Sequence, residues 1–320
     1  MKRPARITER IDAVTWLTPE YLSPCLPPPK AVKIELTARC DFRCSFCSTG
    51  RALVKRGDIE WDLLTRILRD ARGAGVREAG LFYLGEAMLY PRLADAVRYA
   101  KRECLYPFVF LTTNGRVASE AKIDACVRAG LDSLKFSLNA PGRAQFLEVT
   151  GRDAFDTVIA NIKRARRVID RVREETGHVC RLYVSSVIHS DIDRAPMDAM
   201  VAELLPYLDE HYYLPMHAHA HVEAGLSPKN AVGGAAARYA ARRAPLPCWS
   251  LFTVAHVTHR GRISACCWDH DDRFTCGDLT ETSFMEAWNS AGFQRLRSAH
   301  LALDVRGTVC EACVAAHGKD

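Results

Sequence analysis

The sequence predicts an α/β fold with a parallel sheet, followed by a small domain of a different kind. Between residues 31 and 222, six short runs of apolar, β-branched and aromatic residues alternate with longer amphipathic segments. Strands that are each followed by a helix pair in parallel through right-handed crossovers. After residues 223–247, a linker rich in Ala, Gly, Arg and Pro, the pattern changes. The alternation alone allows either a doubly wound sheet or a partial barrel.

The expected elements follow in order along the chain. Residues 1–30 form a lead-in that ends in the proline-rich CLPPPK. Strands are expected in AVKIEL, EAGLFYL, PFVFLTTN, LDSLKFSLN, CRLYVSSVI and HYYLPMH, and the apolar periodicity predicts a helix in each gap between them. Residues 248–320 predict a β-hairpin that turns near Gly261, followed by one amphipathic helix in SFMEAWNSAGFQRLRSAH.

The composition restricts the class of protein. Of the 320 residues, 48% are apolar and 26% are charged, which is ordinary for a soluble globular protein. No apolar run approaches the ~18 residues of a membrane span, and the basic N-terminus lacks the apolar core of a signal peptide. The net charge of +6 is mild, and the basic residues are not interleaved with aromatics, so nothing points to nucleic acid. We therefore expect a cytoplasmic protein with no membrane and no nucleic-acid partner.

Thirteen cysteines indicate metal or redox chemistry. An odd number in a long chain does not fit a disulfide framework. Four stand alone and are expected to be small buried apolar residues: Cys25, Cys104, Cys126 and Cys180. The other nine fall into an early and a late group.

The early group is CDFRCSFC, with Cys40, Cys44 and Cys47 directly after the first expected strand. In parallel α/β folds, sites are built at the carboxyl ends of the strands. A closed structural zinc site needs four ligands. Apart from Cys25, no cysteine or histidine lies within fifty residues on either side of this group. Three thiolates on a cubane leave one iron open, which suits this spacing better.

The motif C-x3-C-x-aromatic-C, with Phe46 in the aromatic position, resembles that of the radical S-adenosylmethionine (SAM) superfamily. The resemblance implies a partial (β/α)6 barrel of the TIM type over about residues 31–222. It also implies that the three thiolates hold a [4Fe–4S] cluster whose open iron binds SAM. An external reductant such as a flavodoxin or ferredoxin would supply the electron that cleaves SAM to a 5′-deoxyadenosyl radical.

Further positions resemble the SAM contacts of this superfamily. Gly85 and Glu86 in LGEAML resemble the Gly-Gly-Glu-Pro motif that binds the SAM amino group, although Leu84 and Ala87 replace its first glycine and its proline. An ordinary turn at a strand end is the alternative. The other expected cofactor-binding residues also follow strands: Asn114, the ribose position Ser137, and Ser185 and Val187, where the backbone would contact adenine.

The late group has the spacing C-x17-C-x43-C-x2-C, formed by Cys248, Cys266, Cys310 and Cys313. With four residues between Gly261 and Cys266, it resembles the twitch domain, a short form of the SPASM domain, and implies one auxiliary [4Fe–4S] cluster. A structural zinc ribbon is the alternative. Cys267 and Cys276 are left over. Cys267 is either simply packed or a hydrogen-atom donor. Cys276 opens CGDL, which resembles a twitch turn, and either replaces one of the four ligands or serves as that donor. If Cys267 lies on a strand, it points away from the face of Cys266.

The spacing is similar to that of 2-deoxy-scyllo-inosamine dehydrogenases and related sugar- and aminocyclitol-modifying enzymes. This implies a small-molecule substrate (a sugar, aminocyclitol or nucleoside) whose secondary alcohol is oxidised to a ketone, with the auxiliary cluster accepting the electron. One alternative is a radical epimerase with Cys267 or Cys276 as hydrogen donor. Another is a peptide maturase, which thirty residues before the barrel disfavour, because leader-guided enzymes carry a binding domain there. A non-catalytic iron–sulfur carrier would not need Glu86, Asn114 and Ser137 at SAM positions.

The substrate site is expected after the sixth strand, in LPMHAHAHVEAG. His217, His219 and His221 would share one face of an extended segment. An imidazole with its ordinary pKa near ~6.5 is a suitable proton acceptor. His217 and Glu223 are the expected substrate-site residues. A metal site and a plain polar loop are the alternatives.

Overall fold

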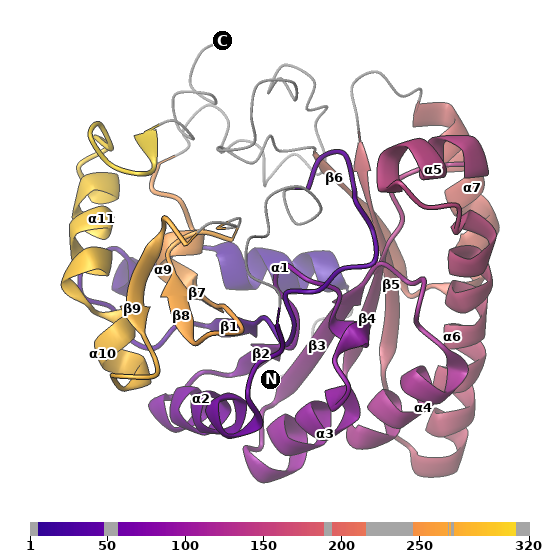
Figure 1. Ribbon diagram of the computed structural model, residues 1–320, viewed down its shortest axis with the longest axis horizontal. Coiled ribbons are helices and arrows are strands. Elements are labelled where there is room, and N and C mark those ends of the chain that lie inside the picture. The colour runs from indigo at the N-terminus through magenta and orange to yellow at the C-terminus, as the bar shows by residue number, and fades with distance from the viewer. Residues whose placement is uncertain are drawn as a thin grey trace.

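The computed structural model describes residues 6–47, 57–188, 194–215, 246–267, 269 and 272–311. Its centre is one nine-stranded sheet with the order β6-β5-β4-β3-β2-β1-β7-β8-β9 (Figure 1). The strands are β1 (Ala31–Ile34), β2 (Glu78–Gly80), β3 (Phe108–Thr113), β4 (Ser133–Ser137), β5 (Arg181–Ile188), β6 (Glu210–Pro215), β7 (Val254–Val257), β8 (Arg262–Ser264) and β9 (Thr275–Asp278).

The first six strands are parallel, and each new strand is added on the same side of the previous one. A doubly wound sheet would reverse direction at a switch point. The strand order therefore confirms the partial barrel and removes the alternative that the alternation left open.

Helices fill the gaps between the strands and cover the outer side of the sheet (Figure 1). They are α2 (Trp61–Ala74), α3 (Leu93–Arg98) with its extension Tyr99–Glu103, α4 (Glu120–Ala129), α6 (Phe155–Thr176) and α7 (Arg194–Leu204). Short turns of helix lie at Pro19–Tyr21, Ala87–Leu89 and Leu205–Tyr207. Alternate strand residues such as Val32 and Leu134 are buried beneath these helices in one apolar core. The residues between them, such as Lys33 and Lys135, face the concave side.

The expected lead-in contains a helix, α1 (Ile7–Thr15), that closes one end of the half barrel. The carboxylate of Glu210 accepts a hydrogen bond from the Ile7 N–H at 2.7 Å and caps this helix. Arg10 forms an ion pair with Glu78 at 2.6 Å and lies 3.3 Å from the ring centroid of Phe108. Glu78, Phe108 and Glu210 are the first residues of their strands. Helix α1 therefore covers the amino ends and leaves the carboxyl ends for a site.

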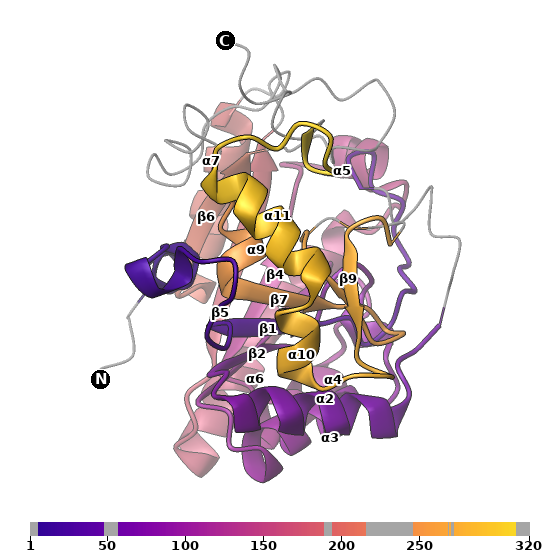
Figure 2. The ribbon, with the colours of Figure 1, turned by 90° about the vertical axis from the view of Figure 1, so that its left-hand side faces the viewer.

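The predicted hairpin is confirmed and continues the sheet. Strand β7 pairs with β1 in parallel, and β8 pairs with β7 antiparallel around Gly261, which has a φ of +79°. The short helix α9 (Ser250–Thr253) precedes β7, and α10 (Phe284–Trp288) and α11 (Ala291–Leu301) pack beside the hairpin (Figure 2). Because β7 joins β1, the late cysteine region is attached directly to the half barrel.

Two predictions about helices are wrong in detail. The single helix expected after residue 282 is two helices, because Ser290 caps α11 and Asn289 turns away to bond the lead-in. An additional helix, α5 (Arg143–Thr150), stands between β4 and α6. Pro141, Gly142 and Gly151 flank it and make this stretch resemble a loop. Among the described residues, no helix is long and apolar enough to cross a membrane.

Candidate cluster and SAM site

The early cysteines lie in a loop that follows β1 at the carboxyl end of the sheet. The Arg43 N–H donates to the Thr150 carbonyl and the Ser45 N–H to that of Val149, both at 2.8 Å. The Cys47 N–H donates to the Cys44 carbonyl at 3.0 Å. The unpredicted helix α5 therefore holds the cysteine loop in place.

The three thiols lie within electrostatic range of one another. Burial raises the pKa of Cys40 to about 12 and raises that of Cys44 further, and the charge of Cys47 adds to both shifts. In the part of the chain that the structure describes, no three Cys, His, Asp or Glu side chains are grouped so as to hold a single metal ion. A set of three half-buried thiols fits the iron–sulfur donor chemistry expected here.

Gly85 lies where the loop after β2 meets the segment that leads to Cys40. A Cβ at this position would stand 1.9 Å from the Thr37 carbonyl oxygen and 2.9 Å from that of Arg39. The Glu86 N–H donates to the Arg39 carbonyl at 2.8 Å. The two loops therefore form one unit, and only glycine permits this backbone approach.

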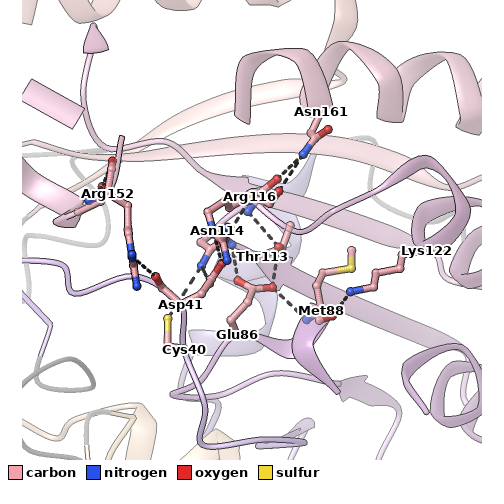
Figure 3. Close-up of polar contacts among 12 residues, drawn as sticks. Cys40, Asp41, Glu86, Met88, Thr113, Asn114, Arg116, Lys122, Arg152 and Asn161 are labelled. Atoms are coloured by element: carbon pink, nitrogen blue, oxygen red, sulfur yellow. Dashed lines mark hydrogen bonds and ion pairs between the residues drawn. The ribbon is translucent and has the colours of Figure 1, made fainter. Parts of the chain in front are cut away.

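Glu86 is 2% exposed, and its carboxylate joins the ends of β2 and β3 (Figure 3). It accepts hydrogen bonds from Thr113 Oγ1 at 2.7 Å, from the Met88 N–H at 3.0 Å and from the Asn114 N–H at 2.6 Å. Burial raises the pKa of this carboxyl to about 7 against the opposing effect of these bonds. The carboxylate of Glu86 therefore links the β2 loop to the end of β3.

Asn114 connects β3 to the cysteine loop. Its Nδ2 donates to Asp41 Oδ1 at 2.7 Å and lies 3.9 Å from Cys40 Sγ (Figure 3). Asp41 also forms an ion pair with Arg116, and its carbonyl accepts from Arg152 Nε at 3.1 Å. Sequence reasoning missed Asp41, Arg116 and Arg152. The only signal for Asp41 was its place directly after the first cysteine.

The other expected SAM positions lie further along the carboxyl ends. Ser137 and Ser185 are register partners on β4 and β5 and face the concave side. The Val187 N–H donates to Asn139 Oδ1 at 2.9 Å. Phe46 lies within the cysteine loop. His217, Glu223 and Cys313 are outside the described residues, as is the linker up to residue 245.

The late cysteines are held by backbone contacts beside the hairpin. The Cys248 N–H donates to His300 Nδ1 at 3.2 Å, and the Cys310 N–H to Thr308 Oγ1 at 3.1 Å. The Cys266 carbonyl accepts from the Tyr83 hydroxyl at 2.6 Å. Because Tyr83 stands two residues before Gly85, the loop after β2 contacts the late cysteine region through Tyr83 and the segment before Cys40 through its own backbone.

The expectation that Cys267 points away from Cys266 is wrong. Strand β8 ends at Ser264, so the two cysteines are not on a strand and the alternation of faces does not apply. A hydrogen bond with the Cys266 side chain, helped by the charge of Lys33, lowers the pKa of Cys267 to about 7. Cys276 instead lies on β9, where burial raises its pKa to about 12.

The fold and the two cysteine groups define a class of protein. It is a half barrel with one iron–sulfur site at the carboxyl ends of its strands and a second beside the strands β7 to β9 that extend its sheet. Residues 34–180 match the radical SAM superfamily, and residues 248–314 match SPASM, an iron–sulfur cluster-binding domain. The chain therefore contains a radical SAM domain followed by a SPASM domain. These domains imply SAM and two [4Fe–4S] clusters as cofactors, and radical SAM enzymes use a reductant.

Relatives of known activity match only part of the chain. The GTP 3′,8-cyclase of Chlorobaculum tepidum is 33% identical over 133 residues, which is 42% of this chain and 40% of the cyclase. The PqqA peptide cyclase of Gluconobacter oxydans is 35% identical over 111 residues, 34% of this chain and 30% of that protein. The chain thus matches less than half the length of these relatives.

Two solved structures are similar over most of the chain. BtrN in complex with AdoMet and 2-DOIA has a TM-score of 0.56 at 14% identity, covering 85% of this chain and 86% of BtrN. Streptococcus suis SuiB bound to the precursor peptide SuiA has a TM-score of 0.67 at 15% identity, covering 86% of this chain and 68% of SuiB. At this identity the likeness supports the fold.

Proposed function

We propose that the protein is a radical SAM oxidoreductase that oxidises a secondary alcohol of a sugar, an aminocyclitol or a nucleoside to a ketone. The observation that carries the proposal is the contact of Tyr83 with Cys266. The Tyr83 hydroxyl also accepts a hydrogen bond from the Asp269 N–H at 3.2 Å. The loop assigned to SAM and the loop assigned to the auxiliary cluster are therefore adjacent. This suits a reaction that removes both a hydrogen atom and an electron from one substrate.

When bound, SAM and the clusters would supply hydrogen-atom abstraction and uptake of the electron. The chain itself binds and orients the substrate. Helix α1 closes the amino ends of the strands, so the substrate approaches from the carboxyl ends. The hydroxyl proton must leave during the oxidation, and His217 and Glu223 remain the proposed acceptors. A flavodoxin or ferredoxin in the cytoplasm is the proposed reductant.

The likeness to BtrN, whose structure holds AdoMet and 2-DOIA, supports a small-molecule substrate. Peptide modification is the second candidate, because SuiB bound to a precursor peptide has a higher TM-score. Epimerisation is the third. Cys267 suits a hydrogen donor better than Cys276, since it stands near Lys33 of the concave face whereas Cys276 stands near Arg297 of α11.

The test uses the reconstituted holoenzyme with SAM and dithionite under anaerobic conditions. A panel of sugars, nucleosides and 2-deoxy-scyllo-inosamine is supplied in deuterated water, and 5′-deoxyadenosine and product masses are measured. A product lighter by two mass units supports oxidation. An isomer of unchanged connectivity carrying one solvent deuteron would instead establish epimerisation, and Cys267→Ala should then stop product formation while 5′-deoxyadenosine is still released. Cys276→Ala is the matched control. No 5′-deoxyadenosine with any substrate would refute the enzyme assignment.

A further inference from the structure

The carboxamide of Asn114 is fixed in one orientation in the turn that follows β3 (Figure 3). Its Oδ1 accepts a hydrogen bond from the Arg116 N–H at 3.0 Å. Because that side of the carboxamide faces a backbone N–H, it must carry the oxygen, and the NH₂ group lies on the other side. There Nδ2 donates to Asp41 Oδ1 at 2.7 Å. The direction of both amide hydrogens is therefore determined by the protein.

The acceptor Asp41 is itself held in place. Its side chain is 9% exposed and forms an ion pair with Arg116, and its carbonyl accepts from Arg152 Nε at 3.1 Å. From helix α6, Asn161 Nδ2 donates to the Arg116 carbonyl at 3.2 Å (Figure 3). The turn and the start of the cysteine loop are thus joined by side chains from three separate segments, which orient Asn114.

The second amide hydrogen of Asn114 is the one that Asp41 does not take. Cys40 Sγ lies 3.9 Å from Asn114 Nδ2 and is the acceptor on that side. Burial raises the pKa of Cys40 to about 12, so its thiolate depends on donors such as this one. Among the described residues, no side chain donates to Cys44 or Cys47. The three thiols of the early group are therefore unequal.

We propose that Asn114, oriented by Asp41 and Arg116, donates a hydrogen bond to the Cys40 thiolate and raises the reduction potential of the SAM-binding cluster. The reduced cluster carries one more negative charge, which an N–H directed at a sulfur ligand stabilises. Asn114 is then a positioning residue that acts on the cluster through Cys40, whereas the resemblance to the superfamily assigned it to SAM. The proposal is independent of the proposed oxidation.

Anaerobic redox titration of the reconstituted, SAM-free holoenzyme, followed by electron paramagnetic resonance, tests the proposal. Asn114→Ser keeps an oxygen that can accept from the Arg116 N–H but has no N–H that reaches Cys40. Asn114→Ala removes both functions. Each variant should reduce the SAM-binding cluster about two- to tenfold less favourably, and tenfold corresponds to ~59 mV for one electron. The auxiliary cluster should titrate as in the unaltered protein.

Asn139→Ala is the matched control. Asn139 is also a buried carboxamide beyond the end of a strand, and its Oδ1 accepts from the Val187 N–H at 2.9 Å. It follows β4 and belongs to no contact of the cysteine loop described above. The control should lower the melting temperature and leave the potentials of both clusters unchanged.

SAM affinity separates the two assignments of Asn114. We expect Asn114→Ser to bind SAM within twofold of the unaltered protein while its potential falls. An unchanged potential with SAM binding weakened at least tenfold would overturn the proposal, as would an unchanged potential in both iron-replete variants. The unaltered holoenzyme, labelled with ¹⁵N-asparagine, gives a result even if a variant does not fold. Electron nuclear double resonance should show one ¹⁵N coupled to the reduced SAM-binding cluster, and its absence would refute the hydrogen bond.

Discussion

Gly85 shows how the cysteine loop depends on single backbone positions. The Glu86 N–H and the missing Cβ of Gly85 bring the β2 loop against Thr37 and Arg39, immediately before Cys40. The sequence pointed to Gly85 and Glu86 by resemblance, either as SAM contacts or as an ordinary turn at a strand end. The structure adds that Glu86 is an internal link whose three donors come from the β2 loop and the end of β3.

We expect Gly85→Ala to displace the cysteine loop. Overpacking against a buried backbone costs about 1–3 kcal/mol, and here the neighbouring atom is a carbonyl oxygen that cannot rotate away. The variant should melt at lower temperature and retain less iron after reconstitution. Gly73→Ala is the control. Gly73 lies inside helix α2 with nothing within 4 Å of the added Cβ, so alanine should stabilise the protein by roughly 0.5–1 kcal/mol. Full iron content in Gly85→Ala would contradict this account.

The apolar periodicity of the sequence was enough to predict the strands and most of the helices. It did not predict where each helix ends, because capping residues and distant hydrogen bonds decide that. Every expected strand of the half barrel is present, because alternate residues face a common core. Helix α5 was missed because its flanking glycines and proline resemble a loop. The interruption between α10 and α11 was missed because the residue that Asn289 bonds there is distant in the sequence. Asn289 bonds Leu26, and no local pattern encodes that pairing.

Asn289→Ala tests whether this pairing attaches the lead-in to the auxiliary region. Asn289 Oδ1 accepts from the Leu26 N–H at 2.8 Å and from Arg297 Nη1 at 3.0 Å, and its Nδ2 donates to the Leu26 carbonyl at 2.9 Å. Replacing Asn289 by alanine removes the hydrogen-bond partners of these partly buried groups. Each group that water does not reach should then lower the free energy of unfolding by about 1–3 kcal/mol. We expect faster hydrogen exchange at Leu26 and a lower melting temperature.

The matched control for Asn289→Ala is Gln294→Ala. Gln294 makes one exposed hydrogen bond, from its Nε2 to the Asn289 carbonyl. Its loss should change stability by less than ~0.5 kcal/mol. Equal exchange rates at Leu26 in the two variants would show that the lead-in is held by other contacts, such as the bond from Trp288 Nε1 to the Pro27 carbonyl at 3.0 Å.

In the whole molecule, the hairpin that carries the late cysteines continues the sheet that carries the early ones. The β1–β7 pairing was beyond sequence reasoning, because these strands are about two hundred residues apart and no local pattern links them. The pair Glu35 and His259 strengthens the same junction, with Glu35 Oε2 2.8 Å from His259 Nδ1. The cysteine spacing predicted two separate sites. The pairing of β7 with β1 places the two cysteine regions on adjacent parts of one sheet.

Tyr83→Phe tests whether the β2 loop and the auxiliary cysteine region are linked, and it leaves every cysteine unchanged. The variant loses the bond to the Cys266 carbonyl and the acceptor for the Asp269 N–H, so the auxiliary loop should shift while the cysteine loop stays in place. Tyr106→Phe is the matched control, because the Tyr106 hydroxyl donates to the buried Leu68 carbonyl at 2.8 Å, away from both cysteine groups. Both changes should cost about 1–3 kcal/mol. Only Tyr83→Phe should alter the reduction potential and electron paramagnetic resonance of the auxiliary cluster. Identical spectra in both variants would mean that the contact supports the fold without linking the two sites.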